Sequence, residues 1–223
     1  MDSTDKSRPV FVYGQKEIDH LKRKDKKLGA AIDRIGLIQR EITPDPFSAL
    51  VSSIVSQQIS GKAAETVWNR LRLLLNERKS AELTLDQGSS SPNITPASVA
   101  QASLADIKAC GMSERKAGYI KGIAEAALVG VVDFSELHTL TDQEIILKLS
   151  ALRGVGVWTA EMLLIFSLNR LNVLSYKDLA ICRGMMNLYG HKELAPERFE
   201  RYRRRYSPYC SVASLYLWAL SAD

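Results

Sequence analysis

The chain has 223 residues, enough for one sizeable domain or for two small lobes that each bury a core. Its 46% hydrophobic and 25% charged residues are ordinary globular composition and argue against a disordered chain. Lys and Arg exceed Asp and Glu by 30 to 25, and the net charge of +5 permits a polyanionic partner without requiring one.

Three observations exclude other classes of protein. No run of the chain approaches the roughly eighteen apolar residues that span a bilayer, and residues 1–10 lack the apolar core of a secretory signal. Cys110, Cys182 and Cys210 form no CxxC pair, which argues against a zinc site, an iron–sulfur cluster and a disulfide framework. We therefore expect a reduced, soluble, intracellular protein without membrane contact. It would lie in the nucleus of a eukaryote, or in the cytoplasm or nucleoid of a bacterium.

Helical signals dominate the first half of the chain. Asp45 followed by Pro46 is an N-cap with proline at the first helical position, and apolar residues then recur at helical spacing. A second helix, rich in Ala and Leu, is expected over 62–75. The Ser, Pro and Gly residues of 86–96 predict an exposed connecting loop.

The second half continues the helical pattern, with capping boxes, closing glycines and apolar stripes as its signals. It predicts a short helix from the capping box 103–106 to Gly111, one between Ser113 and Gly130, one that opens on the capping box Thr141–Glu144, and a central buried helix over 157–168.

These signals predict an all-α protein with about ten helices. Two short apolar runs, 11–13 and 129–134, are the only strand signals, and no hairpin turn joins them. Basic runs at 22–27 and 201–205 fit either solvated helix faces or contact surfaces.

The segment LRGVGVWTA, residues 152–160, lies between two of the predicted helices. Its glycines, Gly154 and Gly156, allow a sharp turn and the close approach of another backbone. The turn leads into a helix N-terminus, whose free N–H groups and positive dipole end suit a phosphate. Any tight turn between helices can use two glycines, so this pattern alone does not decide the function.

This segment resembles the hairpin LPGxGxxTA of the helix–hairpin–helix superfamily of DNA glycosylases, which an essential aspartate follows about twenty residues later. Asp178 lies twenty residues after Trp158, within SYKDLAICR, a segment similar to the family's PxDDLxxR. Residues 46–64 and 207–218 resemble the branch of the family that excises alkylated bases, the 3-methyladenine DNA glycosylases II.

The resemblance implies two helical lobes with a DNA-binding cleft between them. Residues 46–170 would form the lobe with the wedge loop and the helix–hairpin–helix motif, and residues 1–45 with 171–223 would form the lobe that carries the catalytic aspartate. Only about forty-five residues precede the matching region, too few for the N-terminal β domain of the well-known bacterial relatives. We expect the compact form of the family, acting as a monomer on damaged double-stranded DNA.

An enzyme that acts on a base within a duplex must extrude that nucleotide, and a side chain must fill the gap. By resemblance Ile59 is this wedge and Gln58 its neighbour; read without the family, Ile59 would be a core residue at a helix end. Contacts to the DNA backbone are implied for the hairpin and for two further basic residues: Arg153, Gly154, Gly156, Thr159, Lys62 and Arg183.

Cleavage of an N-glycosidic bond builds positive charge on the sugar, which a fixed carboxylate stabilises while it orients a water. The resemblance assigns this role to Asp178. Asp178 also reads as the N-cap of a helix that begins at Leu179, and both roles are compatible.

Trp158 occupies the position at which bifunctional members of the family carry a nucleophilic lysine, so the resemblance implies a monofunctional glycosylase without lyase activity. Alkylated purines such as 3-methyladenine are cationic, and aromatic faces attract cations. Trp158 and Tyr209 would line the base pocket, whereas Tyr216 and Trp218 are assigned to the core. No cofactor is required, although the backbone carbonyls of Ser150, Leu152 and Val155 would suit a Na⁺ or K⁺ ion.

The chain departs from the family pattern directly before the catalytic position. Ser175, Tyr176 and Lys177 replace a segment that normally contains a proline and a first acidic residue, and a missing proline loosens a loop. This departure keeps a second hypothesis open, a non-catalytic relative that binds abasic or distorted DNA. A plain helical interaction module would require the hairpin, the spacing and the aspartate to coincide by chance.

Overall fold

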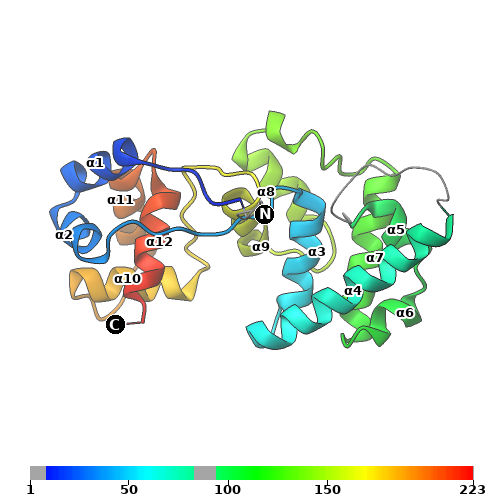
Figure 1. Ribbon diagram of the computed structural model, residues 1–223. Coiled ribbons are helices and arrows are strands. Elements are labelled where there is room, and N and C mark those ends of the chain that lie inside the picture. The colour runs from blue at the N-terminus through cyan, green and yellow to red at the C-terminus, as the bar shows by residue number, and fades with distance from the viewer. Residues whose placement is uncertain (1–8, 83–93, 223) are drawn as a thin grey trace, which may run out of the picture. The chain divides into compact units, whose positions relative to one another are not determined.

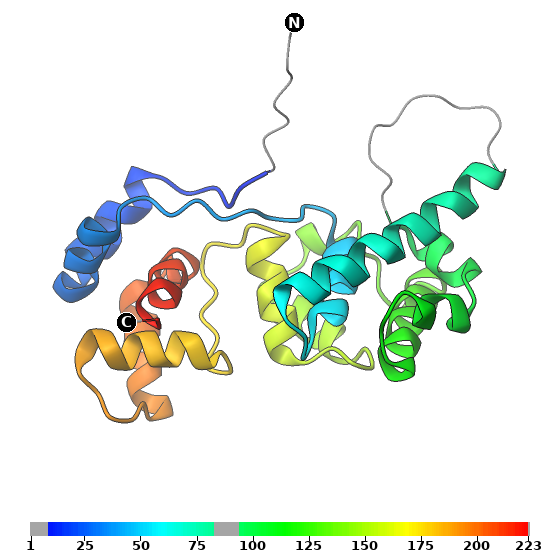
Figure 2. The ribbon, with the colours of Figure 1, turned by 60° about the horizontal axis from the view of Figure 1, so that its bottom comes forward.

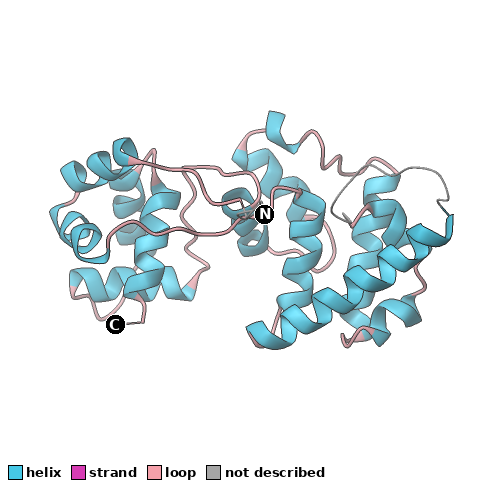
Figure 3. Cartoon of the chain, in the orientation of Figure 1, coloured by secondary structure: helices cyan, strands magenta, loops and turns pink. Residues whose placement is uncertain are grey.

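The computed structural model describes residues 9–82 and 94–222. Within these ranges the chain forms twelve α-helices, one short 3-10 helix and no strand (Figures 1 and 3). The predicted all-α class is confirmed, with two α-helices more than expected. The strand signals at 11–13 and 129–134 reduce to one isolated bridge, between Val10 and Glu41. None of the helices in the described part is long and apolar enough to span a membrane.

The helices divide into two compact units. The first unit combines the chain up to Pro44 with the chain from Glu161 onward, and the second unit is formed by Asp45–Ala160.

The first unit is built around its last helix. Its helices are α1 (Gln15–Lys24), α2 (Lys26–Ile35), α10 (Leu179–Tyr189), α11 (Pro196–Tyr206) and α12 (Cys210–Leu220), with most of α9 (Val157–Phe166). Helix α12 is buried along most of its length and crosses α10 closely (Figures 1 and 2). A Cβ atom at Gly184 of α10 would lie 2.0 Å from the Leu217 carbonyl oxygen, so the crossing requires glycine there.

A buried carboxylate joins the N-terminal helices to this core. Asp25 caps α2 by accepting from the Leu28 N–H, and its other oxygen accepts from Tyr189 and from the Arg205 guanidinium at 2.7 Å each. Burial alone would raise the pKa of Asp25, but these hydrogen bonds outweigh it and hold the pKa below its usual value. The two basic runs therefore contribute in part to the fold, since Arg205 pairs with Asp25 and Lys22 with Asp33.

The second unit contains the helices between the two parts of the first. They are α3 (Pro46–Ser56), α4 (Gly61–Glu82), α5 (Pro96–Gln101), α6 (Leu104–Ala109), α7 (Glu114–Leu128), the 3-10 helix η1 (Leu137–Thr139) and α8 (Asp142–Ser150), followed by the first turn of α9. The capping predictions are confirmed: the side chains of Asp45, Ser103, Ser113 and Thr141 each accept from a backbone N–H of the helix that follows.

Three boundary predictions were wrong. Helix α4 runs to Glu82 and not to residue 75. Most of the exposed loop predicted over 86–96 lies outside the described residues, which resume at Ile94. At its end the prediction fails, because Ile94 is a buried core residue and Pro96 already begins α5. The helix predicted over 157–168 ends at Phe166, and its start is not buried: Trp158 is 40% exposed.

Candidate functional site

The turn between α8 and α9 is anchored by apolar side chains. Leu152 and Val155 are buried, and the Val155 N–H donates to the Leu152 carbonyl at 3.1 Å. Arg153 and Gly156 lie exposed on the surface of the turn, and Thr159 is buried one helical turn beyond it. The segment is therefore a rigid hairpin that presents backbone, one guanidinium and the N-terminal end of α9 to solvent.

The two hairpin glycines differ in backbone conformation and surroundings, although the same role was predicted for both from the sequence. Gly154 has a φ of +90°, and a Cβ atom there would lie 2.3 Å from the ring of Tyr119. Gly156 has no such backbone constraint, and nothing lies within 4 Å of the place its Cβ would take. The turn needs glycine at residue 154, whereas glycine at 156 leaves open surface.

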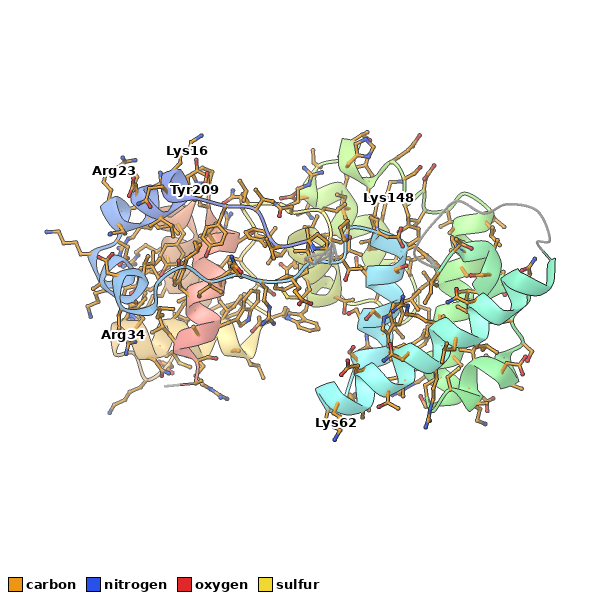
Figure 4. The ribbon with its side chains drawn as sticks, in the orientation of Figure 1. Lys16, Arg23, Arg34, Lys62, Lys148 and Tyr209 are labelled. Atoms are coloured by element: carbon orange, nitrogen blue, oxygen red, sulfur yellow. The ribbon has the colours of Figure 1, made fainter. Side chains whose placement is uncertain are left out.

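The loop between α3 and α4 is a surface feature next to this hairpin. Gln58 adopts a left-handed backbone with a φ of 59°, and Ile59 is 39% exposed. Ile59 is therefore not the core residue of the alternative interpretation. The Gln57 side-chain amide donates to the Gly154 carbonyl at 3.2 Å, which places loop and hairpin side by side. Lys62 projects from the first turn of α4 (Figure 4).

Asp178 is fixed at the N-terminus of α10. One of its carboxylate oxygens accepts from the backbone N–H groups of Ala180 at 2.9 Å and Ile181 at 3.0 Å, and the residue is only 7% exposed. The N-cap interpretation is confirmed, and it accounts for how a buried carboxylate is held in one orientation.

A second carboxylate, which the sequence analysis did not identify, lies beside Asp178. Glu161 of α9 accepts at 2.5 Å from the hydroxyl of Ser175, a residue without solvent exposure. Burial raises the pKa of Glu161 and the charge of Asp178 adds to this, against the opposing effects of Ser175 and Lys177. No local pattern in the sequence marks Glu161, because its partner Ser175 lies fourteen residues further along the chain.

The remaining predicted residues occupy separate places. Trp158 is exposed near the start of α9, and Arg183 is exposed on α10. Tyr209 is half-buried at the start of α12 (Figure 4). Its ring packs edge-on against His20, with centroids 5.0 Å apart.

The two aromatic residues assigned to the core belong to α12. Tyr216 is fully buried, and Trp218 is half-buried against Phe166, with ring centroids 5.4 Å apart. Their packing confirms that assignment.

A family match over most of the chain shows which superfamily the protein belongs to. Residues 51–208 match the HhH-GPD superfamily of base excision DNA repair proteins. The chain belongs to this superfamily.

Members of the HhH-GPD superfamily also match over most of their length. The DNA-3-methyladenine glycosylase 1 of Schizosaccharomyces pombe is 31% identical over 179 residues, 79% of this chain and 73% of the relative. A crystal structure of a Bacillus halodurans DNA-3-methyladenine glycosidase has a TM-score of 0.80 at 34% identity and covers 96% of this chain and 93% of that one. The S. pombe Mag1 glycosylase in complex with abasic DNA has a TM-score of 0.75 at 29% identity, with 92% and 95% covered.

Proposed function

We propose that this HhH-GPD protein is a monofunctional base-excision repair glycosylase that hydrolyses the N-glycosidic bond of alkylated purines, such as 3-methyladenine, in duplex DNA. The observation that carries the proposal is the carboxylate of Asp178, which is buried and held by two N–H groups. The resemblance assigns the catalytic role to this residue. The names of its relatives support the substrate class.

Asp178 would act on the sugar. A fixed carboxylate stabilises the positive charge that develops as the bond to the base lengthens, and it orients the water that attacks the sugar. Because the backbone N–H groups already fix its orientation, little reorganisation is needed during the reaction. An alkylated purine carries positive charge on its ring and leaves readily, so one carboxylate suffices.

The base would be recognised by aromatic faces. Trp158 is exposed and Tyr209 half-buried, so both retain ring surface that a flipped cationic base can contact. Tryptophan has no amine with which to attack the sugar, which supports hydrolysis without strand cleavage.

The hairpin and the loop before α4 would bind the duplex. Ile59 would fill the gap left by the extruded base, with Gln58 as its neighbour. Phosphates would be bound by the hairpin residues Arg153, Gly154, Gly156 and Thr159, and by the basic side chains of Lys62 and Arg183.

We propose that the same hairpin would also hold a monovalent cation. The carbonyls of Ser150, Leu152 and Val155 would hold Na⁺ or K⁺, since the Leu152 oxygen accepts one N–H and keeps a second lone pair. Such an ion would add positive charge beside a phosphate. We further propose that the protein acts as a monomer.

Base release from methylated duplex DNA tests the proposal. The purified protein should liberate 3-methyladenine and leave the phosphodiester backbone intact until alkali is added. Strand cleavage without alkali or amine would contradict the monofunctional assignment. If the protein binds abasic duplex tightly and releases no base, the second hypothesis holds. The protein would then be a non-catalytic relative, as the altered residues before Asp178 allow.

A further inference from the structure

A lysine of another helix hydrogen-bonds the backbone at the start of the proposed wedge loop, residues 57–60 between α3 and α4. Lys116 lies in the first turn of α7, and its ammonium group donates to the carbonyls of Val55 at 2.9 Å and of Gln57. Val55 belongs to the last turn of α3, and Gln57 is its C-cap residue, immediately before the left-handed residue Gln58.

This contact suits the chemistry of a helix end. The last carbonyls of a helix lack intrahelical partners and carry the negative end of its dipole, so a cation there is favourable. The side chain of Lys116 is half-buried, and burial together with the neighbouring Arg115 lowers the pKa of its amine. With two of its three N–H donors bound to carbonyls, most of its hydrogen-bonding capacity serves the loop.

The side chain of Gln57 ties the same loop to the hairpin. The backbone carbonyl of Gln57 accepts from Lys116, while its side-chain amide donates to the Gly154 carbonyl at 3.2 Å. Gln58 then takes a φ of 59°, a conformation that costs a non-glycine residue energy and persists only where the surroundings impose it.

From this arrangement we infer that Lys116, acting together with Gln57, is the positioning element that presents Ile59 for insertion into DNA before the duplex arrives. The inference rests on the proposed function, because it assumes that Ile59 is the wedge. A loop ordered in advance does not lose the entropy of ordering when it binds.

Lys116→Met removes the two hydrogen bonds, and Arg115→Met is the matched control. The control deletes a positive charge from the exposed neighbouring residue and leaves the loop contacts in place. The measured quantity is the affinity ratio: the affinity for a duplex that contains a tetrahydrofuran abasic analogue, divided by the affinity for the same duplex without the analogue. A 2-aminopurine placed opposite the analogue reports unstacking through its fluorescence.

Lys116→Met should lower the affinity ratio about fivefold and reduce the fluorescence rise, because the loop loses the two hydrogen bonds that hold its backbone. Arg115→Met should leave the ratio within about twofold, because a lost charge weakens binding to both duplexes alike. Lys116→Arg, which keeps the donors, should restore most of the ratio. Thermal unfolding is recorded for each variant.

A lower melting temperature with an unchanged ratio and fluorescence would make Lys116 a purely structural residue and overturn the inference. If Lys116→Met does not fold, Gln57→Met provides the test, since an unchanged ratio in that variant also overturns it. Ile59→Ala separates the two hypotheses: a loss there without one in Lys116→Met contradicts the positioning role alone. A wild-type protein without preference for the abasic duplex contradicts the proposed function as well.

Discussion

The two loops with proposed roles in the reaction are stabilised in opposite ways. The carboxylate of Asp178 is buried and bound directly by backbone N–H groups at the start of α10. Ile59 is exposed, and the hydrogen bonds around it hold the backbone of the preceding residues and not its own side chain.

This difference corresponds to two tasks. A group that stabilises charge gains from burial and fixed orientation, since electrostatic interactions are stronger away from water. A group that enters DNA must stay exposed until the duplex arrives, so only its backbone can be fixed in advance. Substitutions should therefore separate catalysis from recognition.

The largest effect on folding stability is expected at the hairpin. Gly154→Ala places a Cβ within 2.3 Å of the Tyr119 ring at a φ of +90°, so we expect a loss of about 1–3 kcal/mol in unfolding free energy together with the loss of DNA binding. Gly156→Ala is the control: its melting temperature should stay within about 1 °C while duplex affinity falls, because only a closely approaching DNA backbone meets the new methyl group. Equal melting temperatures for the two variants would refute the distinction between the glycines.

Ile59→Ala should act on recognition alone. Removal of an apolar wedge side chain should weaken binding to abasic duplex about tenfold, in line with the 1.5–3 kcal/mol gained by full burial of such a side chain. Because Ile59 is 39% exposed in the free protein, its melting temperature should change little. Fluorescence anisotropy and thermal unfolding measure the two quantities. An unchanged affinity would remove Ile59 from the wedge role.

Ser175→Ala should act on catalysis alone and more weakly. Loss of the hydroxyl that binds Glu161 loosens the loop before Asp178, and we expect single-turnover base release to slow about fivefold, equivalent to roughly 1 kcal/mol for one hydrogen bond. Affinity for abasic duplex should not change. A parallel loss of affinity would contradict the separation of the two loops.

Glu161→Gln should change how the stability of the folded protein depends on pH. The raised pKa of Glu161 means that its ionisation destabilises the folded protein as pH rises from the usual carboxyl value of 4.5 to the folded-state pKa, and the loss persists above it. The glutamine carbonyl still accepts from Ser175. The melting temperature of the variant should therefore exceed that of wild type at pH 8 and equal it within a few degrees at pH 4. The reverse trend would show that the buried charge stabilises the fold.

The sequence predicted the helices where capping residues mark them, as at Asp45 and Thr141, because caps are local interactions. The family resemblance assigned the catalytic role to Asp178, and of its two predicted roles the structure confirms the N-cap. The sequence did not predict Glu161 or Lys116, since their roles depend on hydrogen bonds with residues distant in the chain, Ser175 and Val55, which no local pattern records. For the same reason it treated Gly154 and Gly156 alike, although only Gly154 packs against Tyr119.

Asp178→Asn, measured under single-turnover conditions on methylated duplex DNA, tests the central claim most directly. Asparagine caps a helix about as well as aspartate, so the variant should keep its melting temperature within a few degrees and its affinity for abasic duplex. Its rate of 3-methyladenine release should fall by about 100- to 1,000-fold, the effect of removing one main electrostatic group. Release at the wild-type rate by a folded Asp178→Asn protein would contradict the assignment of Asp178 as the catalytic carboxylate.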